Sequence, residues 1–185
     1  MSELTKTLED VFGYTSFRPG QEEVINHLMQ KKKLLVVMPT GAGKSLCYQL
    51  PALLFENQTV VVSPLVALMD DQVIGLKDLG VKAESVHSGM PESKRTEIWE
   101  DFKNKQIKIL YISPESLMRN EILSALKILN ISMFVVDEAH CISKWGSDFR
   151  REYELLKELQ NHFPEAIISA FTATADEETR ADINN

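Results

Sequence analysis

Hydrophobic residues along this chain gather in short runs, separated by longer segments of mixed polarity. The runs are rich in valine, isoleucine and leucine, and the segments between them are long enough for helices. This alternation is typical of βαβ units around a parallel sheet, whose strands are apolar on both faces because helices cover both. We predict strands at residues 34–38, 59–63, 83–87, 108–112, 133–137 and 166–171.

A helix is predicted near the start of the chain, with Pro19 in its first turn and its last residue at Gln30. Three lysines follow at positions 31–33, close to the negative end of the helix dipole. This placement favours a solvated helix end over a DNA-binding patch.

Composition indicates one globular domain with a sizeable core, since the 185 residues are 44% hydrophobic and 25% charged. The net charge of −7 argues against a protein that coats a polyanion, but it leaves room for a local basic groove. No apolar run reaches the length of a membrane span, and no targeting segment is evident. Cys47 and Cys141 do not form a CxxC unit, so we expect two reduced thiols in an intracellular protein.

The segment MPTGAGKS at 38–45 has the pattern of a phosphate-binding loop between a strand and a helix. Gly41 and Gly43 would let backbone N–H groups face phosphate oxygens, Lys44 would reach the β- and γ-phosphates, and Ser45 would ligate Mg²⁺. Met38 stands where the general pattern has its first glycine, and a plain glycine-rich turn remains the alternative. The predicted nucleotide-binding residues of the loop are Met38, Pro39, Thr40, Gly41, Ala42, Gly43, Lys44 and Ser45.

Two further strands end in polar residues. In FVVDEAHC, Asp137 is placed to hold Mg²⁺ through its water shell and Glu138 to polarise the attacking water, although an acid pair alone could be a solvated loop. In FTATA, the hydroxyls of Thr172 and Thr174 could sense the acid pair and His140, or could simply begin a helix. The phosphate loop and the acid pair together favour nucleotide hydrolysis.

The order of MPTGAGKS, SPLVALMDDQ, DEAH and TATA resembles the first motor lobe of a superfamily 2 helicase. FGYTSFRPGQEEVI at 12–25 and HCISKWGSDFRREY at 140–153 are similar to segments of the RecQ family of DNA helicases. The chain departs from the family at Phe171, where leucine is usual, and at Arg151, where proline is common.

The resemblance implies an α/β fold: a three-layer RecA-like P-loop NTPase domain with a mostly parallel central sheet flanked by helices. It implies one N-terminal ATP-binding domain over residues 1–185, with an adenine-reading segment at 1–30 and the P-loop core at 31–185. A second motor lobe and C-terminal domains are expected to lie outside this chain. ATP and Mg²⁺ are the implied cofactors, and the implied catalytic residues are Lys44, Asp137, Glu138 and His140.

By the same resemblance, Gln21 hydrogen-bonds the adenine edge while Tyr14 and Arg18 flank the base and ribose. An amide offers both a donor and an acceptor, and a ring or a guanidinium can lie against a base. The alternative is that Phe12, Tyr14 and Phe17 are core aromatic residues, which we expect for the two phenylalanines.

Several residues are expected to contact DNA or to couple DNA to the acid pair. In ISKWGSDFRR the aromatic and basic residues are interleaved, as in segments that stack single-stranded bases, although a buried loop anchor is an equal alternative. The same resemblance implies that small hydroxyls and backbone N–H groups at strand ends contact DNA phosphates without reading sequence. The residues concerned are Ser63, Pro64, Ser88, Gly89, Ser113, Trp145, Phe149, Arg150, Thr172 and Thr174.

The family relationship implies an ATP-dependent motor that moves 3′ to 5′ on DNA in repair and recombination. Its expected partners are single-stranded and duplex DNA and the second lobe, with no membrane. The lobe alone would be a monomer without unwinding activity. A bacterial cytoplasm, near the nucleoid, is favoured over a eukaryotic nucleus. The alternatives are an RNA-remodelling helicase lobe and a nucleotide-dependent binding module without turnover.

Overall fold

A six-stranded sheet forms the centre of the molecule in a computed structural model that describes residues 1–39, 41–139 and 150–173. All strand pairs are parallel, in the order β1-β6-β5-β2-β4-β3. Each predicted strand is confirmed to within one residue at either end. The strands are β1 (Leu34–Val37), β2 (Thr59–Val62), β3 (Ala83–Val86), β4 (Ile109–Ile112), β5 (Met133–Val136) and β6 (Ile167–Thr172).

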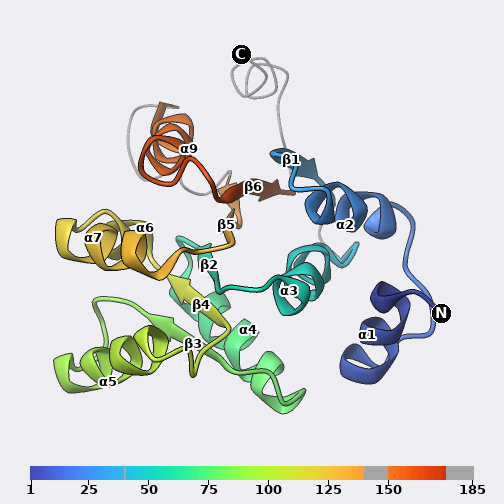
Figure 1. The fold of residues 1–185 in the computed structure, drawn as a ribbon, viewed down its shortest axis with the longest axis horizontal. Helices are drawn as coiled ribbons and strands as arrows, with labels where there is room; N and C mark the ends of the chain where they lie inside the picture. The colour runs from blue at the N-terminus through green and yellow to red at the C-terminus, as the bar shows by residue number, and fades with distance from the viewer. Residues whose placement is uncertain (40, 140–149, 174–185) are drawn as a thin grey trace.

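Helices cover both faces of this sheet, so the expected three-layer α/β architecture is confirmed (Figure 1). The first face carries α1 (Glu3–Phe12), α2 (Gln21–Met29), α3 (Lys44–Leu54) and α4 (Val66–Asp78). The second face carries α5 (Glu92–Lys103), α6 (Pro114–Leu117), α7 (Asn120–Leu129) and α9 (Arg150–His162).

Alternation along the strands divides the buried side chains into two cores. Val61, Tyr111 and Val135 belong to the core beneath the first face, whereas their neighbours Val60 and Leu110 belong to the core beneath the second. Successive side chains of a strand point to opposite faces, so this division follows from the pleat. Asp137, directly after β5, continues the series that points to the first face, toward α3.

The start of α2 differs from the prediction. The helix begins at Gln21, and Pro19 lies before it in a turn rather than in its first turn. Gly20 is the N-cap residue with φ 85°, a left-handed conformation that glycine adopts readily and that separates Pro19 from the helix. The lysines at 31–33 follow the helix and are exposed, as predicted.

The carboxyl ends of all six strands lie along one edge of the sheet, because the strands are parallel. The phosphate loop follows β1, Ser63 follows β2, Ser113 follows β4 and Asp137 follows β5. In open α/β sheets this edge is where ligands bind. These predicted site residues, which belong to distant segments of the chain, therefore lie along one edge of the sheet.

Among the described residues, no helix combines the length and apolar character that crossing a bilayer requires.

Candidate active site

The phosphate loop joins β1 to α3 through two glycines with left-handed backbones. Gly41 has φ 85° and Gly43 has φ 81°, and Gly43 is the N-cap residue of α3. Such angles cost residues with a Cβ about 1–2 kcal/mol. Because α3 begins at Lys44, the first backbone N–H groups of an eleven-residue helix open toward the loop.

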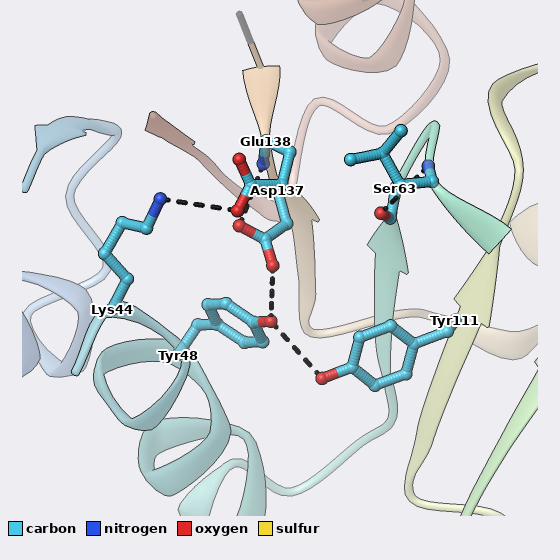
Figure 2. Close-up of polar contacts among 7 residues, drawn as sticks. Lys44, Tyr48, Ser63, Tyr111, Asp137 and Glu138 are labelled. Carbon is cyan, nitrogen blue, oxygen red and sulfur yellow. Dashed lines mark hydrogen bonds and ion pairs between the residues drawn. The ribbon is translucent and has the colours of Figure 1, made fainter. Parts of the chain in front are cut away.

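Lys44 extends from α3 toward the acid pair after β5 (Figure 2). Its Nζ lies 3.5 Å from Glu138 Oε1, although the two residues are 94 positions apart in sequence. The two side chains are only 11% and 22% exposed, so this contact is shielded from bulk water. The loop lysine and the acid pair, predicted separately from sequence, are thus side by side.

Asp137 and Glu138 are held in a specific conformation at the end of β5. The Asp137 backbone N–H continues the ladder by donating to Val62 O at 2.8 Å. Glu138 has φ 51°, an uncommon angle for a residue with a side chain, and its N–H donates to Asp137 Oδ1 at 2.9 Å. Rare backbone angles of this kind cluster at functional sites.

A buried tyrosine contacts the other oxygen of Asp137. The Tyr48 hydroxyl donates to Asp137 Oδ2 at 2.8 Å, and Tyr48 lies one helical turn after Lys44 on the same face of α3. The Tyr111 hydroxyl on β4 lies 3.3 Å from that of Tyr48 (Figure 2). Gln49 Nε2 donates to the Tyr111 hydroxyl at 3.0 Å and to Gln72 Oε1 at 2.8 Å.

Burial changes the acid–base properties of these groups. It raises the pKa of Asp137, an effect that the hydrogen bond from Tyr48 partly offsets. Burial, with a smaller effect from the Asp137 charge, raises the pKa of Tyr48 well above its usual range, so the hydroxyl remains a donor. Burial also raises the pKa of the Cys47 thiol to about 12, which leaves it unreactive at neutral pH.

The donor atoms of the site fit Mg²⁺. The Ser45 hydroxyl and the Asp137 carboxylate are oxygen donors, and Mg²⁺ in nucleotide sites is held by one or two such groups together with phosphate oxygens and water. The described residues contain no cluster of three or more histidine, cysteine or acidic side chains that could hold an ion alone. This donor set is therefore suited to a metal that arrives with a nucleotide.

A pocket of about 560 Å³ lies beside the phosphate loop, between the start of the chain, α3 and α4. The predicted adenine-reading residues Tyr14, Arg18 and Gln21 all line it. Phe12 and Phe17 also line it and are partly buried against the core, whereas Tyr14 is 53% exposed. This separates Tyr14 from the two phenylalanines, in line with the sequence interpretation.

Gln21 and Arg18 are docked on the phosphate loop itself. Gln21 Nε2 donates to Gly43 O at 3.0 Å, and Gln21 Oε1 accepts from the Arg18 backbone N–H at 2.8 Å. The Arg18 guanidinium donates to Gly41 O at 2.8 Å. The segment predicted to recognise the base therefore also braces the loop predicted to hold the phosphates.

Of the residues predicted to contact DNA, those that the structure describes at strand ends lie at the same edge of the sheet but differ in exposure. Ser88 and Gly89 are exposed. Ser63 and Ser113 are 3% and 7% exposed, and the Ser113 hydroxyl donates to Ser116 Oγ at 2.8 Å while capping α6. Pro64 and Thr172 are also buried. The hydroxyl of Ser113 thus has a local structural use.

Several predicted residues fall where the structure gives no placement. Arg150 begins α9, and nothing is described of its side chain. The remaining predicted residues that lie outside the described residues are Thr40, His140, Trp145, Phe149 and Thr174. Their roles remain predictions.

Sequence reasoning missed four polar residues of the site: Tyr48, Gln49, Gln72 and Tyr111. One signal was available for Tyr48, since a position four residues after Lys44 lies on the same helix face. Tyr111 stands inside the apolar run of β4, and only the strand order brings it near α3 and β5.

Comparison with known proteins agrees with this geometry. The DEAD/DEAH box helicase family model matches residues 18–183. The chain is 48% identical over 176 residues to the ATP-dependent DNA helicase RecQ of Haemophilus influenzae, covering 95% of this chain and 28% of that protein. It is 43% identical over 186 residues to the probable ATP-dependent DNA helicase RecS of Bacillus subtilis, covering 100% and 37%.

Solved structures share the fold. A hypothetical ATP-dependent RNA helicase from Sulfolobus tokodaii matches with a TM-score of 0.76 at 22% identity, over all of this chain and 54% of that one. The DUF1998 helicase MrfA bound to DNA and AMPPNP matches with a TM-score of 0.79 at 20% identity, over 98% and 28%. The chain thus belongs to the DEAD/DEAH box helicase family, and the RecQ resemblance of its motifs is confirmed along almost its whole length.

Proposed function

We propose that this chain is the ATP-binding motor lobe of a RecQ-type DNA helicase, and that its nucleotide is hydrolysed to move the protein along DNA. The observation that carries the proposal is the approach of Lys44 Nζ to Glu138 Oε1 at 3.5 Å. It brings together a phosphate-binding cation and a carboxylate able to polarise water, the two groups that phosphoryl transfer to water requires.

In the proposed reaction, Lys44 leaves Glu138 for the β- and γ-phosphates when nucleotide binds. The Glu138 carboxylate then orients the attacking water. Ser45 and Asp137 would hold Mg²⁺, which neutralises charge on the phosphates. Tyr14, Arg18 and Gln21 would receive the base in the pocket beside the loop.

Unwinding is proposed for a longer protein. The chain spans about 28–37% of the length of the curated relatives described above. By family resemblance a second lobe supplies an arginine to the transferring phosphate, and loss of such an arginine lowers turnover roughly 10³–10⁵-fold. Residues 1–185 alone are therefore proposed to bind Mg²⁺ with ATP or ADP, and to bind single-stranded DNA weakly, without unwinding duplexes.

We further propose 3′-to-5′ movement, and a role in repair and recombination, for the longer protein. The longer protein would be located with the chromosome, either in the cytoplasm of a bacterium or in the nucleus of a eukaryote. Trp145 and the residues around it would report bound DNA to the acid pair.

The test is phosphate release by the longer protein with single-stranded DNA, with single-stranded RNA of the same sequence, and without nucleic acid. We expect strong stimulation by DNA and weak stimulation by RNA, with Trp145→Ala losing the stimulation but keeping nucleotide affinity. Equal stimulation by RNA would assign the lobe to RNA remodelling. Nucleotide binding without turnover in any condition would indicate a binding module.

A further inference from the structure

Buried and partly buried polar side chains between α3, α4 and β4 form one hydrogen-bonded network that ends on Asp137. Its members are Gln72, Gln49, Tyr111 and Tyr48. Tyr48 is fully buried and Tyr111 is 1% exposed, so both hydroxyls lie away from solvent. Such groups cost folding free energy unless each has a partner, and here each of these two hydroxyls has at least two.

The donors and acceptors fix the direction in which hydrogen bonds are donated along this network. The two hydrogens of the Gln49 amide go to Gln72 Oε1 and to the Tyr111 oxygen. An ionised carboxylate only accepts, so the single hydrogen of the Tyr48 hydroxyl goes to Asp137 Oδ2. The Tyr111 hydrogen is then directed to the Tyr48 oxygen. The hydrogen bonds from Gln49 through both tyrosines thus all point toward Asp137.

The Asp137 carboxylate accepts one hydrogen bond from the end of this network and one from the backbone, on different oxygens. Tyr48 donates to Oδ2, and the Glu138 N–H donates to Oδ1. These donors come from α3 and from the turn after β5, so the plane of the carboxylate is oriented before any metal binds. Loss of a partner that orients a metal-binding group typically costs roughly 10–100-fold in metal affinity or activity.

We infer that the Tyr48 hydroxyl positions Asp137 for Mg²⁺, and that Tyr111 and Gln49 hold Tyr48 in the orientation this requires. The inference rests on the proposed function, since it assigns Asp137 to the metal. Tyr48 is a positioning residue because it acts on the metal only through Asp137. Its ring also packs edge-on against Phe171 at 5.2 Å, and phenylalanine at position 48 would keep that contact.

The test measures metal binding directly. Mn²⁺ replaces Mg²⁺ as an electron-paramagnetic probe. It is titrated, together with ADP, into the wild-type protein and into the variants Tyr48→Phe and Tyr111→Phe. We expect Mn²⁺ affinity to fall about tenfold in Tyr48→Phe. The fall should be smaller in Tyr111→Phe, the matched control that removes a buried hydroxyl without touching Asp137. ADP affinity measured in a chelator should stay unchanged in both.

Wild-type Mn²⁺ affinity in Tyr48→Phe would overturn the inference. So would an equal loss of ADP affinity in the chelator, which would indicate a general structural defect. If Tyr48→Phe fails to fold, the double variant Tyr48→Phe/Tyr111→Phe also removes the Tyr111 hydroxyl, which in the single variant has lost one of its two partners. The double variant still lacks the donor to Asp137, so the same tenfold loss is expected there. Failure of the wild type itself to bind Mn²⁺ with ADP would instead contradict the proposed function.

Discussion

The two faces of the sheet are packed in different ways. Beneath the second face, apolar side chains fill the space between the strands and α5, α7 and α9, and include the close ring pair Phe134 and Phe163 at 4.4 Å. Beneath the first face, the core contains Tyr48, Gln49 and Tyr111, joined by hydrogen bonds that reach Asp137. Both cores are mainly apolar, but among the described residues the hydrogen-bonded network that reaches Asp137 lies beneath the first face.

This difference separates stability from chemistry within one small domain. Apolar packing stabilises the folded state without orienting any ionised group. A buried polar network orients a carboxylate, and the loss of one partner in it lowers the free energy of unfolding. Substitutions beneath the second face should therefore change the free energy of unfolding, and substitutions on the first face should change ligand affinity. The following predictions test that separation.

The largest expected effect is on the second face, at Phe102 of α5. Its side chain is fully buried and contacts Trp99 edge-on at 5.9 Å. Phe102→Ala should lower the free energy of unfolding by about 3–5 kcal/mol, since it leaves a cavity. Nucleotide affinity per folded molecule should not change. Urea unfolding measures the free energy of unfolding, and fluorescent-ADP titration measures nucleotide affinity. A parallel fall in both would contradict the separation of stability from ligand affinity between the two faces.

The converse effect is expected at Lys44 on the first face. Lys44→Ala removes the proposed charged contact to the β- and γ-phosphates and should weaken Mg·ATP binding by roughly 1.5–3 kcal/mol. Calorimetric titration measures this, with the exposed Lys32→Ala as the matched control. Unchanged affinity in Lys44→Ala, or an equal loss in Lys32→Ala, would contradict the assigned phosphate contact.

Two glycines of the phosphate loop allow a sharper test within the first face. Gly41 and Gly43 have similar positive φ angles, but a Cβ on Gly43 would lie 2.3 Å from Gln21 Nε2, whereas a Cβ on Gly41 would meet nothing within 4 Å. Gly43→Ala should therefore destabilise the chain more than Gly41→Ala does. The expected difference is about 0.5–1.5 kcal/mol, because only the former breaks the hydrogen bond from Gln21 to Gly43 O.

Urea unfolding of the two glycine variants gives this difference. Adding Gln21→Ala to each should remove it, since the hydrogen bond is then absent from both. A difference that persists in the Gln21→Ala background would place its cause elsewhere in the loop.

The smallest effect concerns the pH dependence of stability without metal. Burial raises the pKa of Asp137 above its ordinary value of 3.8, so the folded chain binds this proton more tightly than the unfolded chain. The resulting contribution to stability is present below about pH 4 and is lost as the pH rises through the folded-state pKa. Wild type should therefore lose stability relative to Asp137→Asn as the pH rises, and the second-face variant Phe102→Leu should keep this slope. A slope of opposite sign would contradict the pKa direction.

Much of the fold could be predicted from the sequence. β2, β4 and β5 are apolar runs buried on both faces, and such runs stand out against the helices between them. The start of α2 could not be predicted, because the left-handed conformation of Gly20 moved the helix start past Pro19. The strand order was also out of reach, since β5 lies between β6 and β2 through crossovers that no local pattern specifies.

The candidate site was predictable where a local motif carries the chemistry. Lys44 and Glu138 each belong to such a motif, and the structure brings them within 3.5 Å. Tyr111 belongs to none, because its role depends on a contact made 63 residues away with Tyr48. The Ser113 hydroxyl, predicted for phosphate contact, is buried and caps α6, a local use that the sequence interpretation did not include. Its phosphate contact stays a prediction.

The position of β1 has a consequence for how this domain is made. β1 pairs with β6 alone among the described strands, in a register that joins Leu34 to Ser169 and Val37 to Thr172. A ribosome releases β1 early, and β6, its partner among the described strands, more than a hundred residues later. Contacts this distant in sequence form slowly. The nascent chain must therefore keep the apolar strand β1 without its sheet partner until residues 167–172 have emerged, and nucleotide can help to stabilise the fold only after that point.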